Sequence, residues 1–172
     1  MEIVSEGIAV FKNVFLRSEE VIDMAEESTN WRQGTAGKGV DPNVRITDMH
    51  DLDTETELHN EMLQAFLDGI NEYVKKYSHC RIKGGEHLRI GRYGIGGHYS
   101  VHADAGASER TLSGLLYLNS DFEGGDLNFP HFDLTIKPEE GMLVLFPSNY
   151  VYAHQSLPLT DGKKYVVVSW IK

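Results

Sequence analysis

The sequence predicts a mainly β fold, an antiparallel sandwich or barrel with two helices packed on the outer face of one sheet. Two observations support this prediction. Helical spacing of apolar residues occurs in the first 85 residues, and from Glu86 onward short apolar runs are separated by Gly, Pro, Asn and Asp. A chain of 172 residues can bury a core of its own, so we expect one domain over 1–172.

Two helices are expected before the β region. Residues 18–28 combine Ser18, a candidate N-cap, with acidic residues in the first turn, where the helix dipole favours them. Residues 54–77 carry apolar side chains at the three-and-four spacing of one helical face. Thr54 and Glu57 have the spacing of a capping box at the start of this second helix.

The remaining segments divide the domain into an N-terminal helical and lid region, 1–85, and a β core, 86–172. Residues 30–48 are rich in glycine and have little periodicity, which predicts a long mobile loop and a candidate lid over the site. Eight short strands are expected in the core. In chain order they are 86–94, 98–104, 110–119, 124–129, 133–138, 141–147, 150–157 and 163–171.

The composition narrows the classes of partner. The formal net charge of −10 disfavours binding to nucleic acid, which depends on clustered Lys and Arg, and favours a basic or neutral peptide instead. The single cysteine, Cys80, excludes an internal disulfide framework. We see no export signal and no apolar stretch long enough to cross a membrane, which predicts a cytoplasmic protein.

Two His-x-Asp pairs are candidate metal sites. On a strand, this spacing puts an imidazole and a carboxylate on the same face. His102 and Asp104 lie on an expected strand, and enough strands follow for His154 to return beside them. His131 and Asp133 follow a proline in an expected turn, so we place that pair in a surface loop.

The set His102, Asp104 and His154 would form a two-histidine, one-carboxylate triad. Such a triad occupies one face of an octahedral ion and leaves positions open, which is typical of Fe(II) oxygenases. Zinc sites are more often tetrahedral, with a single open position.

Together with this triad, a series of motifs resembles the prolyl 4-hydroxylase branch of the 2-oxoglutarate and Fe(II)-dependent dioxygenases. The resemblance covers about residues 86–172 and rests on several motifs in order. They are Tyr93 and Tyr99 before the His-x-Asp pair, Arg110 and Tyr117, "GGDLNFP", "GMLVLFPS", and His154 followed by Lys164 and Trp170.

The resemblance implies a double-stranded β-helix, or jelly-roll, core and hydroxylation of a peptidyl proline. It implies Fe(II), 2-oxoglutarate and O2 as cofactor and cosubstrates, with ascorbate as a further candidate. The site residues implied for 2-oxoglutarate are Lys164, Tyr93 and Tyr117. Those implied for the substrate are Tyr99, Arg110 and Trp170.

The distal carboxylate of 2-oxoglutarate needs a buried cation, and strand parity narrows the choice among Arg110, Lys163 and Lys164. Lys164 shares a face with Trp170, whereas Lys163 lies on the other face. If Trp170 points into the site, so does Lys164. Tyr99 has opposite parity to His102, so a bulge or turn is needed to bring both to one face.

Alternatives stay open at this level. The same oxygenase chemistry could act on another protein side chain or on a free amino acid. A metal-binding β-sandwich without oxygenase activity, such as a cupin-like isomerase or a carbohydrate-binding module, would not need Lys164. The oligomeric state is not determined by the sequence.

Overall fold

The computed structural model of the protein describes residues 1–37, 39–106 and 109–172, and in this part of the chain short strands predominate. The helices are α1 (Ser18–Glu26) and α2 (Glu57–Lys76), with 3-10 turns η1 (Pro130–Phe132) and η2 (Tyr150–Tyr152). The strands are β1 (Glu2–Ser5), β2 (Ile8–Phe11), β3 (Arg32–Gln33), β4 (Arg45–Ile46), β5 (Asp48–Asp51), β6 (Arg89–Tyr93), β7 (His98–His102), β8 (Leu112–Tyr117), β9 (Glu123–Gly124), β10 (Leu127–Phe129), β11 (Leu134–Ile136), β12 (Leu143–Pro147), β13 (His154–Ser156), β14 (Leu159–Asp161) and β15 (Lys164–Ile171).

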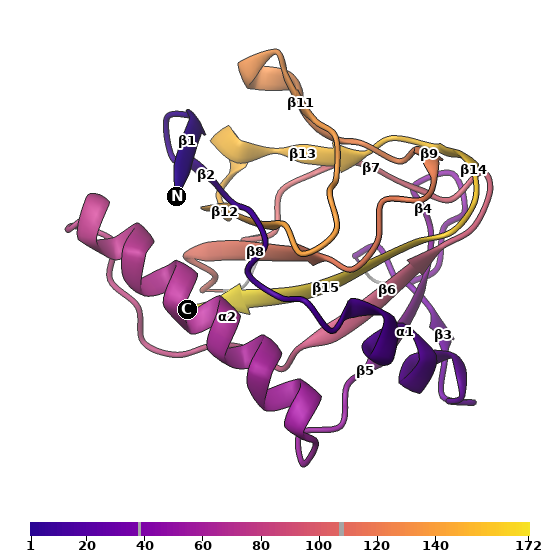
Figure 1. The fold of residues 1–172 in the computed structure, drawn as a ribbon. Helices are drawn as coiled ribbons and strands as arrows, with labels where there is room; N and C mark the ends of the chain where they lie inside the picture. Colours follow the sequence, from indigo (N-terminus) through magenta and orange to yellow (C-terminus); the bar gives the residue numbers. More distant parts are fainter. Residues whose placement is uncertain (38, 107–108) are drawn as a thin grey trace.

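Most of the strands form two facing sheets (Figure 1), and β9 pairs with β14 in a separate two-stranded sheet. The larger sheet has eight strands in the order β1-β2-β12-β8-β15-β6-β5-β3, and the smaller has five in the order β11-β10-β13-β7-β4. Phe129 of the smaller sheet meets Phe146 of the larger one edge to face, with ring centroids 4.9 Å apart. The space between the sheets is therefore filled by side chains from both.

Alternation along the strands separates two hydrophobic clusters. On β12, Val144 and Phe146 belong to the cluster between the sheets, while Leu143 and Leu145 belong to the cluster on the other face of the larger sheet. Because successive side chains of a strand point to opposite faces, one strand contributes to both clusters. The centre of the larger sheet is thus buried on both sides, and its strands β2, β8 and β12 are mostly apolar.

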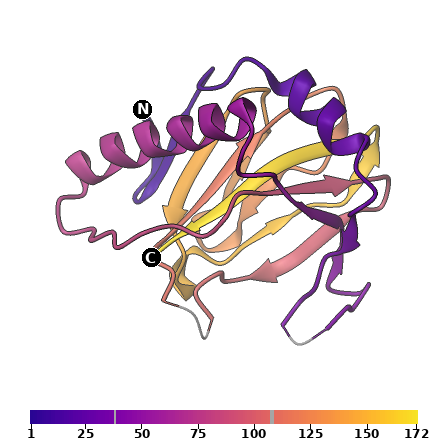
Figure 2. The ribbon, with the colours of Figure 1, turned by 90° about the horizontal axis from the view of Figure 1, so that it is seen from below.

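Both helices lie along the outer face of the larger sheet (Figure 2). Phe66 of α2 packs against Gly114 of β8, where an added Cβ would lie only 2.6 Å from the Phe66 ring. The buried Tyr73 hydroxyl donates a hydrogen bond to the carbonyl oxygen of Gly7, 2.9 Å away. None of the helices in the described residues is long and apolar enough to cross a membrane.

The mainly β class with two helices is confirmed, and each of the eight expected segments from Glu86 onward contains a strand. The starts of the helices differ from the prediction. The hydroxyl of Thr56, and not Thr54, accepts the hydrogen bond from the backbone N–H of His59 that caps α2. At α1 the N-cap residue is Arg17, and Ser18 is already helical with a buried hydroxyl that has no hydrogen-bond partner.

The segment 30–48, predicted as a long mobile loop, contains short strands. Within its described residues this segment contains β3, β4 and the start of β5, so it adds strands to both sheets. Strands of two residues are too short to carry a period, which explains why the sequence pattern did not reveal them. The N-terminal pair β1 and β2 was also missed, although β2 is fully buried beside β12.

Candidate active site

Two neighbouring strands of the smaller sheet, β7 and β13, bring His102, Asp104 and His154 together. His102 is the last residue of β7, His154 is the first residue of β13, and the two are direct partners across these antiparallel strands. The Nε2 atoms of His102 and His154 lie 3.5 Å and 3.7 Å from the two carboxylate oxygens of Asp104. One ligand atom from each residue fits within a 4.8 Å separation, the arrangement of a three-ligand metal site.

Backbone carbonyls fix the orientation of both imidazoles. The Nδ1 of His102 lies 2.8 Å from the carbonyl oxygen of Ser100, and the Nδ1 of His154 lies 3.1 Å from that of Tyr152. A carbonyl only accepts, so each Nδ1 carries the proton and donates it. Each Nε2 is then left with a lone pair facing Asp104, which is the tautomer that a metal-binding histidine needs.

Asp104 is held by one buried hydroxyl group, which a second buried hydroxyl contacts in turn. The Ser113 hydroxyl donates to Asp104 Oδ2 at 2.5 Å and also contacts the Ser148 hydroxyl at 2.8 Å. Burial acts to raise the pKa of Asp104, but the neighbouring histidines and Ser113 outweigh it and hold this pKa below its usual range. Burial lowers the pKa of His154 to about 4. At neutral pH the carboxylate is therefore charged and His154 is neutral.

This donor set fits Fe(II). Two imidazole nitrogens and one carboxylate oxygen on one side of the ion leave the other side open for further ligands. The second pair does not share this setting. His131 lies in η1 and Asp133 follows it with φ of 48°, and both are exposed, as predicted for a surface turn.

A buried lysine lies in the same pocket as the triad. Lys164, at the start of β15, is only 2% exposed, whereas the neighbouring Lys163 side chain is 60% exposed. The Nζ of Lys164 donates to the carbonyl oxygen of Gly125 and to the hydroxyl of Ser156, each at 2.5 Å. Among the described residues it forms no ion pair, and burial lowers its pKa to about 7. A buried ammonium with only neutral partners is costly unless a bound anion compensates it.

Gly125 makes room for this lysine. It has φ of 67°, a conformation that side chains disfavour, and a Cβ there would lie 3.2 Å from Lys164 Nζ and 2.7 Å from Leu159. The "GGDLNFP" motif therefore has a physical role in this chain: it lets the backbone approach the cation.

Tyr93 and Tyr117 line the same pocket as Lys164. The Lys164 Nζ lies 4.3 Å from the centroid of the Tyr93 ring. Burial raises the pKa of both tyrosines, so their hydroxyls stay protonated and are able to donate at neutral pH.

Tyr99 and Trp170 form aromatic surfaces of the pocket. The Tyr99 ring stacks on the His102 ring with centroids 3.5 Å apart. The expected irregularity is present, because the register between β7 and β13 shifts between the His102 and Tyr99 positions. Trp170 lies on the same face of β15 as Lys164, as parity predicts.

Arg110 lies at the edge of this pocket, just before β8. It donates two hydrogen bonds to the carboxylate of Glu86, at 2.9 Å and 2.8 Å, and one to the backbone carbonyl of Asp104 at 3.2 Å. Its Cζ lies 3.9 Å from the centroid of the Trp170 ring. The guanidinium is therefore already paired and held beside the triad.

Four residues around the site were not predicted from the sequence: Ser113, Ser148, Glu86 and Arg45. Ser113 shares the inward face of β8 with Leu115 and Tyr117, and a polar residue on an otherwise apolar face was a signal that could have found it. Glu86 and Arg45 carry no such signal, because charged residues near strand ends are common on protein surfaces.

Comparison with known proteins agrees with this geometry. Residues 88–172 match the family model described as the 2OG-Fe(II) oxygenase superfamily. Over these residues the chain is similar to this superfamily. The oxygenase match begins at β6 and contains the predicted ligands, Lys164 and Trp170.

Curated proteins similar to this chain include prolyl 4-hydroxylase subunit alpha-1 of Gallus gallus, 26% identical over 160 residues. The match covers 76% of this chain and 31% of that protein, so the chain spans about a third of the relative's length.

Solved structures share the fold of this chain. A prolyl hydroxylase of Trichoplax adhaerens, in complex with a hypoxia inducible factor peptide fragment, superposes with a TM-score of 0.80 at 19% identity, covering 97% of this chain and 84% of its own. The viral collagen prolyl hydroxylase of Paramecium Bursaria Chlorella virus-1, in complex with 2OG, gives a TM-score of 0.75 at 22% identity, covering 96% and 95%.

Proposed function

We propose that this chain is a 2-oxoglutarate- and Fe(II)-dependent dioxygenase that hydroxylates a peptidyl proline. The observation that carries the proposal is a single pocket that contains both a set of metal ligands and a buried cation. The donor set of His102, Asp104 and His154 lies at one end, and the buried ammonium of Lys164 lies at the other. This arrangement suits a keto-diacid whose 1-carboxylate and 2-oxo group face the metal and whose distal carboxylate faces the lysine.

The chain's own residues would bind and orient the reactants. Bound Fe(II), with 2-oxoglutarate and O2, supplies an oxidative decarboxylation to succinate and CO2 that is coupled to insertion of one oxygen atom into a C–H bond. Ser113 and the carbonyls of Ser100 and Tyr152 hold the three ligands in place. Lys164 would pair with the distal carboxylate, and the hydroxyls of Tyr93 and Tyr117 would donate hydrogen bonds to the cosubstrate.

Tyr99 and Trp170 would hold the prolyl ring beside the metal, since both line the pocket. Arg110 is the third proposed substrate residue. Because its Nε and Nη2 are engaged by Glu86, we expect it to reach a peptide carbonyl through its remaining N–H groups.

Four finer assignments accompany this proposal. The two facing sheets would be the double-stranded β-helix of a jelly roll, and the chain would form one domain over 1–172. Ascorbate would serve as an auxiliary reductant. The described part of 30–48 supplies β3 and β4, and we propose that this segment covers the peptide as a lid.

The test is hydroxylation of a proline-containing peptide by the protein supplied with Fe(II), 2-oxoglutarate and O2. We expect succinate and a peptide that has gained one oxygen atom on proline, detected by mass spectrometry. A matched peptide with alanine at that position should gain none. Succinate with oxygen gained only on other residues or on a free amino acid would contradict the substrate assignment. A metal-loaded protein that produced no succinate would contradict the oxygenase assignment and favour a cupin-like binding module.

A further inference from the structure

Arg45 is a cation at the mouth of the pocket that the proposed mechanism does not use. It lies on β4, opposite Tyr99 of β7. Its Cζ lies 4.5 Å from the centroid of the Tyr99 ring, and that ring stacks on the ring of His102. Arg45 and Trp170 line both the pocket and an adjoining groove, so they lie where the pocket opens toward this part of the surface.

The guanidinium of Arg45 has neutral hydrogen-bond partners only. It donates to the carbonyl oxygen of Thr35 at 3.1 Å and to the sulfur of Met49 at 2.9 Å. Its buried Nε has no hydrogen-bond partner, and no carboxylate of the described residues lies within ion-pair distance. The residues outside the described ranges, Lys38, Ala107 and Ser108, carry no carboxylate either.

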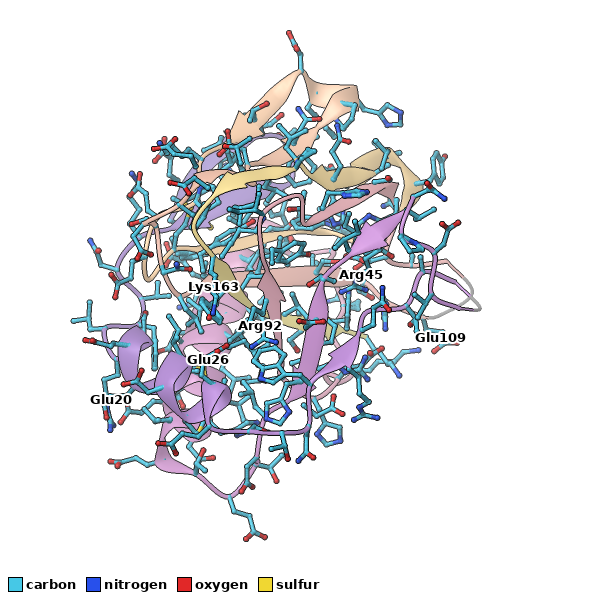
Figure 3. All side chains as sticks on the ribbon, turned by 90° about the vertical axis from the view of Figure 1, so that its right-hand side faces the viewer. Glu20, Glu26, Arg45, Arg92, Glu109 and Lys163 are labelled. Atoms are coloured by element: carbon cyan, nitrogen blue, oxygen red, sulfur yellow. The ribbon has the colours of Figure 1, made fainter. Side chains whose placement is uncertain are left out.

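Other partly buried arginines of this chain are paired. Arg17 contacts Glu20 and Glu61, Arg110 contacts Glu86, and Arg92 contacts Glu26 and Asp48. Figure 3 shows Arg92 close to Glu26 and Lys163, with Arg45 apart from them on the same side of the molecule. In a chain with a net charge of −10, a half-buried arginine without a carboxylate is therefore an exception.

The two acidic residues of β5 that lie near this groove are already engaged. Asp48 accepts from Arg92 at 2.9 Å. Asp51 contacts Arg32 at 3.0 Å and Arg89 at 3.1 Å. Neither carboxylate is left to neutralise Arg45 without breaking another pair.

The position of the guanidinium is fixed from both sides. Tyr99 lies on one side, and Gly34 lies so close on the other that a Cβ there would be 2.6 Å from Arg45 Nε. A cation held in place in this way loses little conformational entropy when it binds an anion. The arrangement parallels that of Lys164, the other cation of the pocket that has only neutral partners.

We infer that Arg45 binds a carboxylate of the substrate, supplied by an acidic side chain close to the hydroxylated proline. This inference rests on the proposed function and extends it to sequence specificity. The ring contacts place the guanidinium roughly two extended residues from the His102 ring, given about 3.3–3.6 Å per residue. The acidic residue should therefore lie within about two positions of the target. The α-carboxylate of a C-terminal or free proline offers the same chemistry.

The test compares acetylated and amidated peptides that contain one proline and differ only in Glu or Gln at each neighbouring position. The wild-type protein, loaded with Mn(II) and 2-oxoglutarate for binding and with Fe(II) for turnover, is compared with Arg45→Gln. Arg32→Gln is the matched control, because Arg32 lines the same groove but is already paired with Asp51. Free L-proline is included as a separate substrate.

We expect the wild type to bind the best Glu peptide about tenfold more tightly than its Gln partner, the effect of one charge-assisted hydrogen-bonded pair. Arg45→Gln should bring the two affinities within about twofold of each other, and Arg32→Gln should keep the preference. If the wild type also turns over L-proline, Arg45→Gln should require a higher proline concentration for half-maximal rate. That result would support carboxylate binding by Arg45 and would identify the α-carboxylate as the group bound.

Three results would overturn the inference. The first is that the wild type binds Glu and Gln peptides with equal affinity and does not turn over L-proline. The second is that the preference for Glu survives in Arg45→Gln. The third is that Arg45→Gln weakens binding of the cosubstrate alone. The last result would mean that Arg45 binds the cosubstrate. Failure of the proposed function can be told apart from failure of this inference. If no proline is oxidised, the ratio of the affinities for Glu and Gln peptides still measures whether Arg45 binds a carboxylate.

Discussion

His102 and Asp104 have the same spacing as His131 and Asp133, but the two pairs occupy opposite environments. The first pair lies at the end of β7 in the smaller sheet, where a third ligand, His154, lies directly across the ladder from His102. The second pair lies in an exposed turn, where the Nδ1 of His131 lies 3.1 Å from the carbonyl oxygen of Val151. The comparison teaches that residue spacing suggests a metal site, whereas burial, neighbouring ligands and an adjoining pocket decide whether the residues can form one.

A pocket adjoins the first pair, and Lys164 is its most sensitive component. We expect Lys164→Met to weaken binding of 2-oxoglutarate by at least on the order of 100-fold, because removing one partner of a buried ion pair costs about 3–5 kcal/mol. The same change should raise the thermal stability of the ligand-free protein, since it removes a desolvated charge. Calorimetric titration and thermal unfolding measure the two effects.

Lys163→Met is the control for this prediction, because Lys163 is largely exposed on the other face of the strand. It should change the affinity for 2-oxoglutarate by no more than about twofold. Equal losses in the two variants would contradict the role of Lys164.

The hydroxyl that holds Asp104 is a second difference between the pairs. Ser113→Ala should weaken Mn(II) binding by about 10-fold to 100-fold, because it frees the carboxylate from the hydrogen bond that orients it. Ser169→Ala removes an equally buried hydroxyl that bonds to the backbone of Glu86 and should leave Mn(II) affinity unchanged. Unchanged affinity in Ser113→Ala would show that the triad does not depend on this support.

The pH dependence of cosubstrate binding should also follow Lys164. Burial lowers its pKa to about 7, so the ammonium is present below that pH and is lost above it. Because the distal carboxylate binds the charged form, the dissociation constant for the cosubstrate should stay flat below pH 7 and rise about tenfold per pH unit above it.

A monoacid with the same chain length, 2-oxopentanoate, lacks the distal carboxylate and should show no such slope. The matched ligand separates titration of Lys164 from titration near the metal. Parallel pH profiles for the two ligands would refute the assignment.

The sequence predicted the core of this site because its signals are local. Strand parity placed Lys164 with Trp170, and the strand order allowed His154 to meet His102. The support around the site was not predictable in this way. Ser113 acts through a contact between the two sheets, from β8 to Asp104, and Arg45 lies on a two-residue strand inside a glycine-rich segment where no periodicity exists. The sequence did not identify Thr56 as the cap of α2, because several residues before the helix have side chains that can cap it.

The most direct test is Mn(II) titration of the wild type, His102→Ala and His131→Ala, followed by electron paramagnetic resonance. The account predicts one bound Mn(II) per chain in the wild type and in His131→Ala, and loss of that binding in His102→Ala. Retention of full binding by His102→Ala, or its loss in His131→Ala, would contradict the assignment of the metal to the first pair.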